Sequence, residues 1–251
     1  MPDPQSTVRA FVAGATGYVG RHVVPALRAR GVEVHAHVRP DSAQLERWRA
    51  AFAAQGAITD TTPWTPDAMR ATMARVAPVL VFALLGTTRA RVRASATRGV
   101  SESYEAVDYG LTHLLLEAAR VQGPPPRFVY LSAVGVRPGV RNPYLAARAK
   151  LEGELGASGC PHLIAQPAYI TGADREESRP VERGVAAVLD GVMSLLAAMG
   201  MHALAGRYRT LSGPELAKGL VELALAPGPA ALTVDARALR LAAGPPLVLG
   251  R

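Results

Sequence analysis

Three glycines near the N-terminus have the spacing of a phosphate-binding turn. Gly14, Gly17 and Gly20 follow a short apolar run that ends at Ala13, and a helix-like pattern begins at Tyr18. A strand that turns sharply into a helix can leave its backbone N–H groups and the positive end of the helix dipole open to a pyrophosphate. Glycine suits such a turn because the backbone needs unusual φ angles and close approach. The spacing therefore predicts a dinucleotide site made by Gly14, Ala15, Thr16, Gly17, Tyr18, Val19 and Gly20.

The residue at the end of the second predicted strand would decide whether the site prefers NAD or NADP. Arg39 stands at the carboxyl end of an alternating apolar run, residues 32–38. An acidic side chain there would accept the ribose hydroxyls of NAD, whereas an arginine pairs with the 2′-phosphate of NADP. An ordinary solvated arginine is the alternative, and we favour NADP (NADPH). Asp60 closes a short third strand, residues 57–59, near where an adenine would lie.

Strands and helices alternate along the chain, with glycine and small polar residues at the strand ends. The run PVLVFALL at 78–85 is continuously apolar, which is typical of a strand buried on both faces of a parallel sheet. The alternation predicts an α/β fold with a doubly wound parallel sheet, the Rossmann fold. Further strands are expected at 127–131, from 163 onward and at 232–234, and helices at 18–30, 42–55, 66–76, 104–120, 214–225 (with Ser212 as N-cap) and 236–243.

A chain of 251 residues with this pattern is commonly a single domain. We expect one NAD(P)-binding Rossmann domain over residues 1–251, with a cofactor-binding core at about 8–170. A small C-terminal substrate or lid portion follows at about 171–243. Within it, residues 185–206 are mostly apolar and rich in methionine. Core packing beside a substrate pocket is the default interpretation of that segment, and a homodimer face or membrane-touching surface is the alternative.

Five strings in the chain carry a resemblance to a known family. They are GATGYVG at 14–20, LGTTR at 85–89, LSAVG at 131–135, Pro143-Tyr144 before a helix, and DREESRP at 174–180. They resemble the atypical short-chain dehydrogenase/reductases, and most closely the branch that includes the Tat-interacting protein, from about residue 8 to residue 239. The resemblance implies cofactor contacts at Leu85, Gly86 and Thr87 and, at the nicotinamide end, at Pro167 and Ile170. Gln166 stands where the family usually has arginine.

The family also implies a serine, a tyrosine and a lysine around the nicotinamide. Here Ser132 would position the substrate oxygen and Tyr144 would give or take a proton, while a lysine four residues on would support the tyrosine. This chain has Arg148 at that place, and Lys150 lies two residues beyond. At about 100° per residue Tyr144 and Arg148 share a helix face, whereas Lys150 points about 240° away, so we take Arg148 as the replacement. The alternative is that Tyr144 merely begins a helix and Arg148 is solvated.

The resemblance implies an NADP-dependent oxidoreductase that transfers a hydride to or from a carbonyl or hydroxyl substrate of unknown identity. Arginine keeps a positive charge beside the tyrosine but cannot release a proton at working pH. That change, with the small C-terminal portion, motivates an alternative: a catalytically silent NADP-binding redox sensor or interaction subunit. The basic loop at 89–98 is expected to be solvated, with an entrance for anionic substrates as the alternative.

The amino-acid composition of the chain limits the partners and the location that we expect for the protein. The net charge is +8, but among 28 basic residues only Lys150 and Lys218 are lysine, and the arginines are scattered, so we expect no nucleic-acid partner. The single cysteine, Cys160, suits a reducing compartment and predicts a cytoplasmic location. No run of 18 uncharged apolar residues occurs, which argues against a membrane span. No residue is assigned to a metal.

Overall fold

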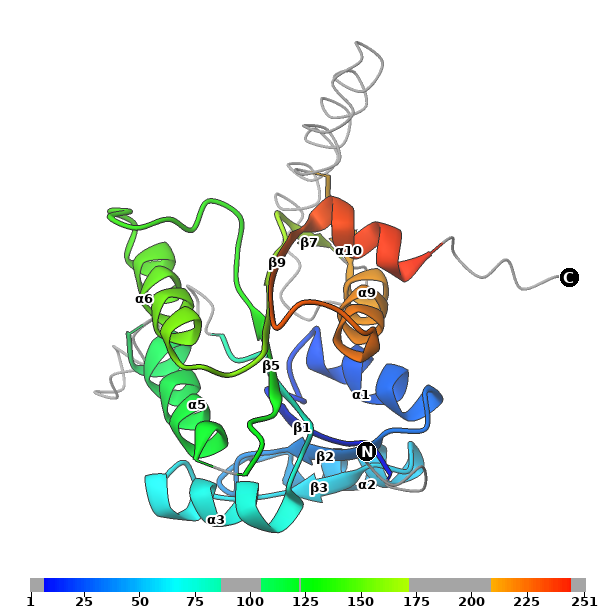
Figure 1. The fold of residues 1–251 in the computed structure, drawn as a ribbon. Coiled ribbons are helices and arrows are strands. Elements are labelled where there is room, and N and C mark those ends of the chain that lie inside the picture. The colour runs from blue at the N-terminus through cyan, green and yellow to red at the C-terminus, as the bar shows by residue number, and fades with distance from the viewer. Residues whose placement is uncertain (1–6, 87–104, 122, 172–208, 245–251) are drawn as a thin grey trace, which may run out of the picture.

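The computed structural model describes residues 7–86, 105–121, 123–171 and 209–244, and its centre is a parallel β-sheet (Figure 1). Within these residues seven strands pair in the order β3-β2-β1-β4-β5-β6-β9. The chain reverses its direction of travel across the sheet between β1 and β4, and ligands of open α/β sheets bind at such a switch point. The strands are β1 (Arg9–Ala13), β2 (Glu33–His37), β3 (Ile58–Asp60), β4 (Leu80–Ala83), β5 (Arg127–Leu131), β6 (His162–Gln166) and β9 (Ala231–Asp235).

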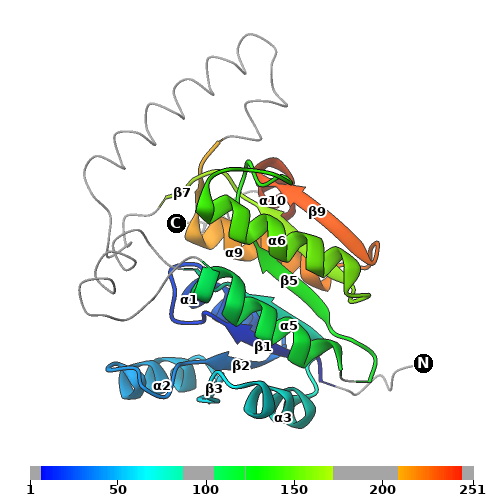
Figure 2. The ribbon, with the colours of Figure 1, turned by 90° about the vertical axis from the view of Figure 1, so that its left-hand side faces the viewer.

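Helices cover both faces of the sheet (Figures 1 and 2). One face carries α1 (Gly20–Ala29), α2 (Leu45–Ala54), α9 (Gly213–Leu225) and α10 (Ala236–Ala243). The other carries α3 (Pro66–Val76), α5 (Thr112–Arg120) and α6 (Pro143–Ala157). A π-helix, η1 (Glu105–Leu111), leads into α5, and two short strands, β7 (Ile170–Thr171) and β8 (Leu211–Ser212), pair apart from the main sheet.

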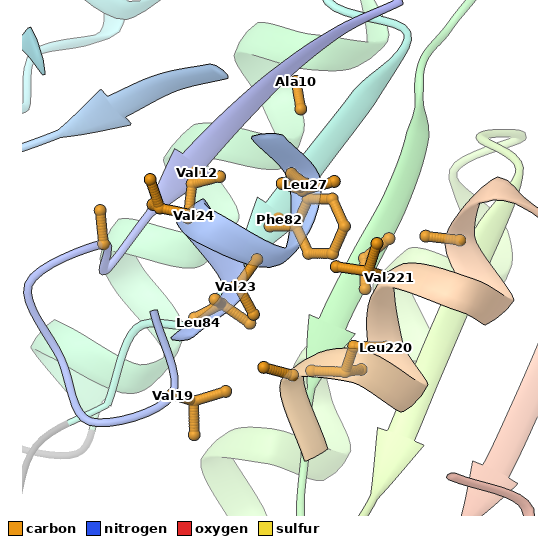
Figure 3. Packing of buried hydrophobic residues seen from close by; sticks show 14 of the residues in the cluster. Ala10, Val12, Val19, Val23, Val24, Leu27, Phe82, Leu84, Leu220 and Val221 are labelled. Carbon is orange, nitrogen blue, oxygen red and sulfur yellow. The ribbon is translucent and has the colours of Figure 1, made fainter. Parts of the chain in front are cut away.

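The core is divided by the alternation of side chains along each strand. Successive strand residues point to opposite faces, so Ala10 and Val12 of β1 join one buried cluster while Phe11 and Ala13 join the other. Figure 3 shows the first cluster, in which side chains of α1 lie against the sheet and α9. Burial of both faces explains why the strands are almost wholly apolar. The labelled contacts of α1 are Val23, Val24 and Leu27, facing Phe82 of β4 and Leu220 and Val221 of α9.

The predicted fold class is confirmed, and several elements end where the sequence predicts them. Helices Pro66–Val76 and Ala236–Ala243 and strand Arg127–Leu131 have the expected bounds. Ser212 is the N-cap of α9 and accepts a hydrogen bond from the backbone of Glu215, whose side chain bonds back to Ser212. This reciprocal capping box satisfies two N–H groups at the helix end.

Other elements differ from the prediction. The helix expected at 104–120 begins as the π-helix η1, and the one expected at 18–30 begins at Gly20 because Tyr18 still belongs to the turn. The strand and helix expected at 232–234 and 214–225 are present as β9 and α9, which join the main sheet and its cover. Thr87, the loop at 89–98, the DREESRP string and the methionine-rich segment at 185–206 lie outside the described residues.

Candidate functional site at the carboxyl edge of the sheet

The glycine turn is closed tightly against the end of β4. Gly14 has a φ of +80°, and a Cβ at this position would lie 2.6 Å from the carbonyl oxygen of Leu84. A Cβ on Gly20 would lie 2.1 Å from the carbonyl oxygen of Gly14. The N-cap of α1, Val19, provides no side-chain cap, and the first turn of the helix holds no acidic residue. No side chain therefore covers the start of α1, and the tight glycine turn has the shape that a dinucleotide pyrophosphate requires.

Tyr18 links this turn to the C-terminal part of the chain. Its hydroxyl donates a hydrogen bond of 3.0 Å to the carbonyl oxygen of Thr171 in β7. Its ring lies edge-on to His22, with the centroids 5.5 Å apart. A Cβ on Gly213, at the start of α9, would come within 2.8 Å of both rings. The side chain of Tyr18 thus packs against β7 and α9, and its contribution to a cofactor site stays a prediction that concerns its backbone.

Arg39 and Asp60, the two residues predicted near the adenosine end, differ in how exposed they are. Arg39 follows β2, and its half-exposed side chain lies 3.8 Å from the carboxylate of Asp41. Asp60 is buried at the end of β3, where one carboxylate oxygen accepts from the backbone N–H of Thr62 at 3.0 Å. Its other oxygen accepts from Arg75 at 2.6 Å. Asp60 therefore ties β3 to α3, and an adenine contact through its carboxylate stays a prediction.

The pKa values of Asp60 and its neighbour His37 are shifted by this packing. Burial raises the pKa of Asp60, but hydrogen bonds from Thr62 and Arg75 outweigh it, so the pKa is lowered overall. Burial lowers the pKa of His37, whose ring bonds to the carbonyl oxygen of Thr62 and packs on Trp64. The edge of the sheet after β2 and β3 therefore carries a fixed carboxylate and a neutral imidazole at neutral pH.

Tyr144 and Arg148 meet on α6, beside the end of β5. The helix begins at Pro143, and the side chain of Asn142 caps it by accepting from the backbone N–H of Leu145 at 3.2 Å. The guanidinium carbon of Arg148 lies 4.6 Å from the centroid of the Tyr144 ring. Lys150 faces elsewhere, with its Nζ 3.7 Å from the centroid of the Tyr109 ring. The structure therefore puts Arg148, rather than Lys150, next to Tyr144.

Arg148 is held in place by groups that the sequence pattern does not identify. It is 5% exposed, and its Nη2 donates to Oδ1 of Asp108 in η1 at 2.7 Å. Its Nη1 donates to the carbonyl oxygen of Leu131 and, at 3.5 Å, to the hydroxyl of Tyr130. A Cβ on Gly86 would lie 3.2 Å from Nη2, so the absence of a side chain lets the chain after β4 pass close to the guanidinium. Arg148 thus joins β5, α6 and η1.

The charge on Arg148 survives its burial. Desolvation alone would lower the pKa of the guanidinium, but its interactions with Tyr144, Tyr130 and Asp108 outweigh that effect and raise the pKa. Burial raises the pKa of Tyr130 far above its usual value, so its phenol stays neutral. Asp108 is fully buried and precedes the buried residues Thr112 and Leu115 by four and seven positions. That helical spacing is the signal that could have placed Asp108 on the inner face.

A second group of side chains surrounds Ser132. The Oγ of Ser132 donates to Oε1 of Glu152, which lies on α6. The Nε2 of Gln166 donates to both carboxylate oxygens of Glu152, at 3.0 and 3.1 Å. The backbone N–H of Val134 donates to the carbonyl oxygen of Pro167 at 2.9 Å. Hydrogen bonds through Glu152 and between Val134 and Pro167 therefore hold the ends of β5 and β6 together around the predicted catalytic serine.

The remaining predicted contacts lie at the same edge of the sheet. Leu85 is the second residue after β4; it is partly buried, packs on the second core cluster and precedes Gly86. Ile170 lies in β7, where it pairs with Leu211 of β8. The glycine turn, Arg39, Asp60, Ser132 and Pro167 all follow carboxyl ends of strands in one parallel sheet. A sheet of this order with a glycine turn at its switch point defines a dinucleotide-binding Rossmann protein.

Comparison with known proteins identifies the family. Residues 14–193 match the family described as NAD(P)H-binding, and the chain belongs to that family. It therefore binds a nicotinamide cofactor, and the turn at Gly14 to Gly20, where a Cβ on Gly14 or Gly20 would clash with backbone, fits the pyrophosphate of such a group. Among the described residues, no helix is both long enough and apolar enough to cross a membrane.

Curated relatives and solved structures agree with this assignment. The chain is 34% identical over 176 residues to "Protein fmp52-1, mitochondrial" of Aspergillus terreus, covering 67% of this chain and 69% of that protein. It is 35% identical over 166 residues to "Divinyl chlorophyllide a 8-vinyl-reductase, chloroplastic" of Oryza sativa subsp. indica, covering 61% of this chain and 36% of that protein. A short-chain dehydrogenase/reductase from Serratia marcescens superposes with a TM-score of 0.60 at 15% identity, covering 94% of this chain and all of that one, so the two share a fold.

Proposed function

We propose that the protein is an NADP-dependent oxidoreductase of the atypical short-chain dehydrogenase/reductase type. It would transfer a hydride between the nicotinamide and a carbonyl or hydroxyl substrate. The observation that carries the proposal is the contact of 4.6 Å between the Arg148 guanidinium and the Tyr144 ring, beside Ser132 and at the same sheet edge as the glycine turn. The NADH- and NADPH-binding family supports the class. The LGTTR and DREESRP strings favour the branch that includes the Tat-interacting protein.

Each of the three side chains has a role that its surroundings support. Tyr144 would donate a proton to the substrate oxygen during reduction, as a general acid. Arg148 would stabilise the phenolate that remains, because it is a permanent cation whose own proton is not available for transfer. Ser132 would hold the substrate oxygen in place. The bound nicotinamide supplies or accepts the hydride.

Preference for NADP would depend on Arg39. Its side chain is half exposed just after β2, and a guanidinium at this place can pair with a 2′-phosphate. Titration of NADPH and NADH by fluorescence should show tighter binding of NADPH. Arg39→Ala should remove most of that preference, whereas Arg49→Ala, which removes a similarly exposed arginine of α2, should keep it. Equal affinities in the wild type would refute the role of Arg39.

Catalysis is tested by turnover of a substrate panel and by one substitution. The panel contains aldehydes, ketones and quinones with NADPH, plus a vinyl-substituted ring because one relative is named a vinyl-reductase. Tyr144→Phe keeps the ring beside Arg148 but removes the proton donor, so turnover should fall by about 10²- to 10⁴-fold. Tyr109→Phe is the matched control, since that hydroxyl bonds to Glu154. Undiminished turnover in Tyr144→Phe would exclude the acid role.

One observation favours a second function, an NADP-binding redox sensor or interaction subunit without catalysis. Both terminal nitrogens of Arg148 already donate to protein groups, Leu131 and Asp108, which leaves fewer donors for a cofactor ribose. A sensor would turn over no panel member. It would instead show NADPH-dependent protection from hydrogen exchange in residues 89–98 or 185–206. Turnover that disappears in Tyr144→Phe would decide for the enzyme.

Assembly, domain organisation and location are part of the same proposal. A single domain over residues 1–251 predicts one cooperative unfolding transition in calorimetry. A homodimer would be detected by light scattering during size-exclusion chromatography. The cytoplasmic location suggested by the single cysteine competes with the mitochondrial location in the name of the Aspergillus terreus relative, and microscopy of a tagged chain would separate the two.

A further inference from the structure

Glu152 is the third residue of a stripe on α6. Tyr144, Arg148 and Glu152 follow one another at intervals of four, so they lie along one face of the helix. The first two form the site proposed above. The third reaches across to β5, where its Oε1 accepts the hydroxyl proton of Ser132. A carboxylate therefore contacts the serine that would hold the substrate oxygen.

The hydrogen bonds around Glu152 fix its carboxylate in one position. Gln166 donates its side-chain amide to both oxygens, at 3.0 and 3.1 Å. Both donors to Glu152 are neutral, whereas the other carboxylate of the site, Asp108, bonds to the cation of Arg148. The negative charge of Glu152 also contributes to the raised pKa of Tyr130. Hydrogen bonds to an ionised acceptor are among the stronger ones in proteins, so Ser132 is held firmly.

The direction of the Ser132 bond has a chemical consequence. A serine hydroxyl has one proton, and an ionised carboxylate can only accept. With that proton donated to Glu152, the oxygen of Ser132 has only lone pairs to offer to any further partner. We propose that Glu152 is a positioning residue that makes Ser132 an acceptor toward the substrate. This inference rests on the proposed function and deepens it.

A hydrogen-bond acceptor at Ser132 would bind the alcohol form and the carbonyl form of a substrate with different affinities. In the binding complex, where Tyr144 is protonated, an alcohol can accept a hydrogen bond from Tyr144 and donate its hydroxyl proton to Ser132; for oxidation that same proton must pass instead to the Tyr144 phenolate. A ketone has no proton to give and takes its hydrogen bond from Tyr144 alone. Glu152 thus makes the site selective for the hydroxyl form. The substrate class is an alcohol and its carbonyl form, with the alcohol bound more tightly because of the Ser132 contact.

The test takes a ketone of the panel and the alcohol formed by its reduction, and compares the KM values of the two compounds in matched variants. Glu152→Ala frees the Ser132 proton, so the KM for the alcohol should rise about tenfold relative to the KM for the ketone, the value of one hydrogen bond. The overall equilibrium fixes the ratio of the kcat/KM values for the two directions. The rise in the KM for the alcohol must therefore be accompanied by a matching change in the kcat values. Glu152→Gln keeps an acceptor oxygen and should restore part of the selectivity.

Glu154→Ala is the control for this experiment. It removes the same kind of side chain from the same helix, but Glu154 bonds to Tyr109 and His113 instead of Ser132. Its ratio of KM values should equal that of the wild type. An unchanged ratio in Glu152→Ala, with both directions slowed equally, would mean that Glu152 only supports the fold and would overturn the inference.

A second measurement does not depend on turnover. Ser132→Ala, Glu152→Ala and the double variant form a thermodynamic cycle in thermal unfolding. Because both single changes break the same bond, the Tm loss of the double variant should be smaller than the sum of the two single losses. If the two Tm losses were additive, the inference that Glu152 positions Ser132 would be wrong even if the protein is an active enzyme. A wild-type protein that turns over no panel member would remove the proposed function, and the cycle would still decide whether Glu152 holds Ser132.

Discussion

The pair formed by Asp108 and Arg148 should be the most sensitive charged contact in the described structure. The two side chains are almost fully buried, 0% and 6% exposed, and their closest atoms are 2.7 Å apart. The pair joins η1 to α6 and, through the carbonyl oxygen of Leu131, to the end of β5. Asp108→Asn would keep the shape and one acceptor oxygen but would leave the guanidinium without its counter-charge. Because the pKa of Arg148 is already raised, the arginine cannot escape by losing its proton.

The size of the effect follows from the burial. Removing one partner of a buried ion pair costs about 3–5 kcal/mol, because the remaining charge is left uncompensated. Asparagine still accepts a hydrogen bond, so we expect the lower end, about 3 kcal/mol. For a chain of this size that loss lowers the Tm by roughly 6–12 °C. Asp67→Asn is the control: Asp67 pairs with Arg70 on the surface and is 94% exposed, so its loss should cost less than about 1 kcal/mol.

Thermal and urea unfolding followed by circular dichroism would measure both variants. The double variant Asp108→Asn/Arg148→Gln removes both charges and should recover part of the lost stability, because no charge is then left buried alone. NADPH titration of Asp108→Asn below its Tm would report whether the cofactor site also depends on the pair. A loss in Asp108→Asn no larger than in Asp67→Asn would refute the argument that this pair organises the site.

Three further predictions concern the turn, the sheet edge and a helix cap. Gly20→Ala should weaken NADPH binding by at least about tenfold, because its Cβ would lie 2.1 Å from the carbonyl oxygen of Gly14. As the control, Gly153→Ala has open space around its Cβ in α6; it should bind NADPH normally, and its free energy of unfolding should rise by up to about 1 kcal/mol. Because folding lowers the pKa of Asp60, the ionised carboxylate stabilises the fold above about pH 3.8, and this stabilisation is lost as the pH falls through the folded pKa. The free energy of unfolding, measured against pH, should therefore show the wild type losing its advantage over Asp60→Asn in this acid range. A difference between the two proteins that does not change with pH would contradict this. Ser212→Ala removes the capping box of α9 and should cost about 1 kcal/mol in urea unfolding, and an unchanged midpoint would show that the cap is not needed.

The fold could be predicted because its signals are local. The glycine spacing at 14–20, the apolar run at 78–85 and the alternation of strands and helices each depend on neighbouring residues. The order of the sheet then follows from the rules of parallel α/β folds. The start of α1 was less predictable, because the ring of Tyr18 belongs to the turn through contacts with Thr171 and Gly213, far away in the sequence.

The partners inside the candidate site could not be predicted in the same way. Asp108 and Arg148 are 40 residues apart, and Ser132 and Glu152 are 20 apart, so no short pattern joins either pair. Asp60 illustrates the opposite problem. Its position at the end of β3 suggests an adenine neighbour, yet its carboxylate bonds to Thr62, two residues on, and to Arg75, which only the packing of α3 on the sheet brings near.

The arginine at 148 is best understood together with the groups that surround it. Its planar fork donates to Asp108 and Leu131 in different directions while its face lies on Tyr144, and Gly86 leaves room for it. A lysine ammonium is a point charge on a flexible stem and cannot make these contacts together. Arg148→Lys, which restores the residue of the resembled family, should therefore lower the Tm by several degrees and should not raise turnover above the wild-type rate. Arg137→Lys, in the exposed loop after β5, is the control and should leave both unchanged. A lysine variant that is equally stable and faster would refute the argument that the contacts with Asp108 and Leu131 require an arginine at this position.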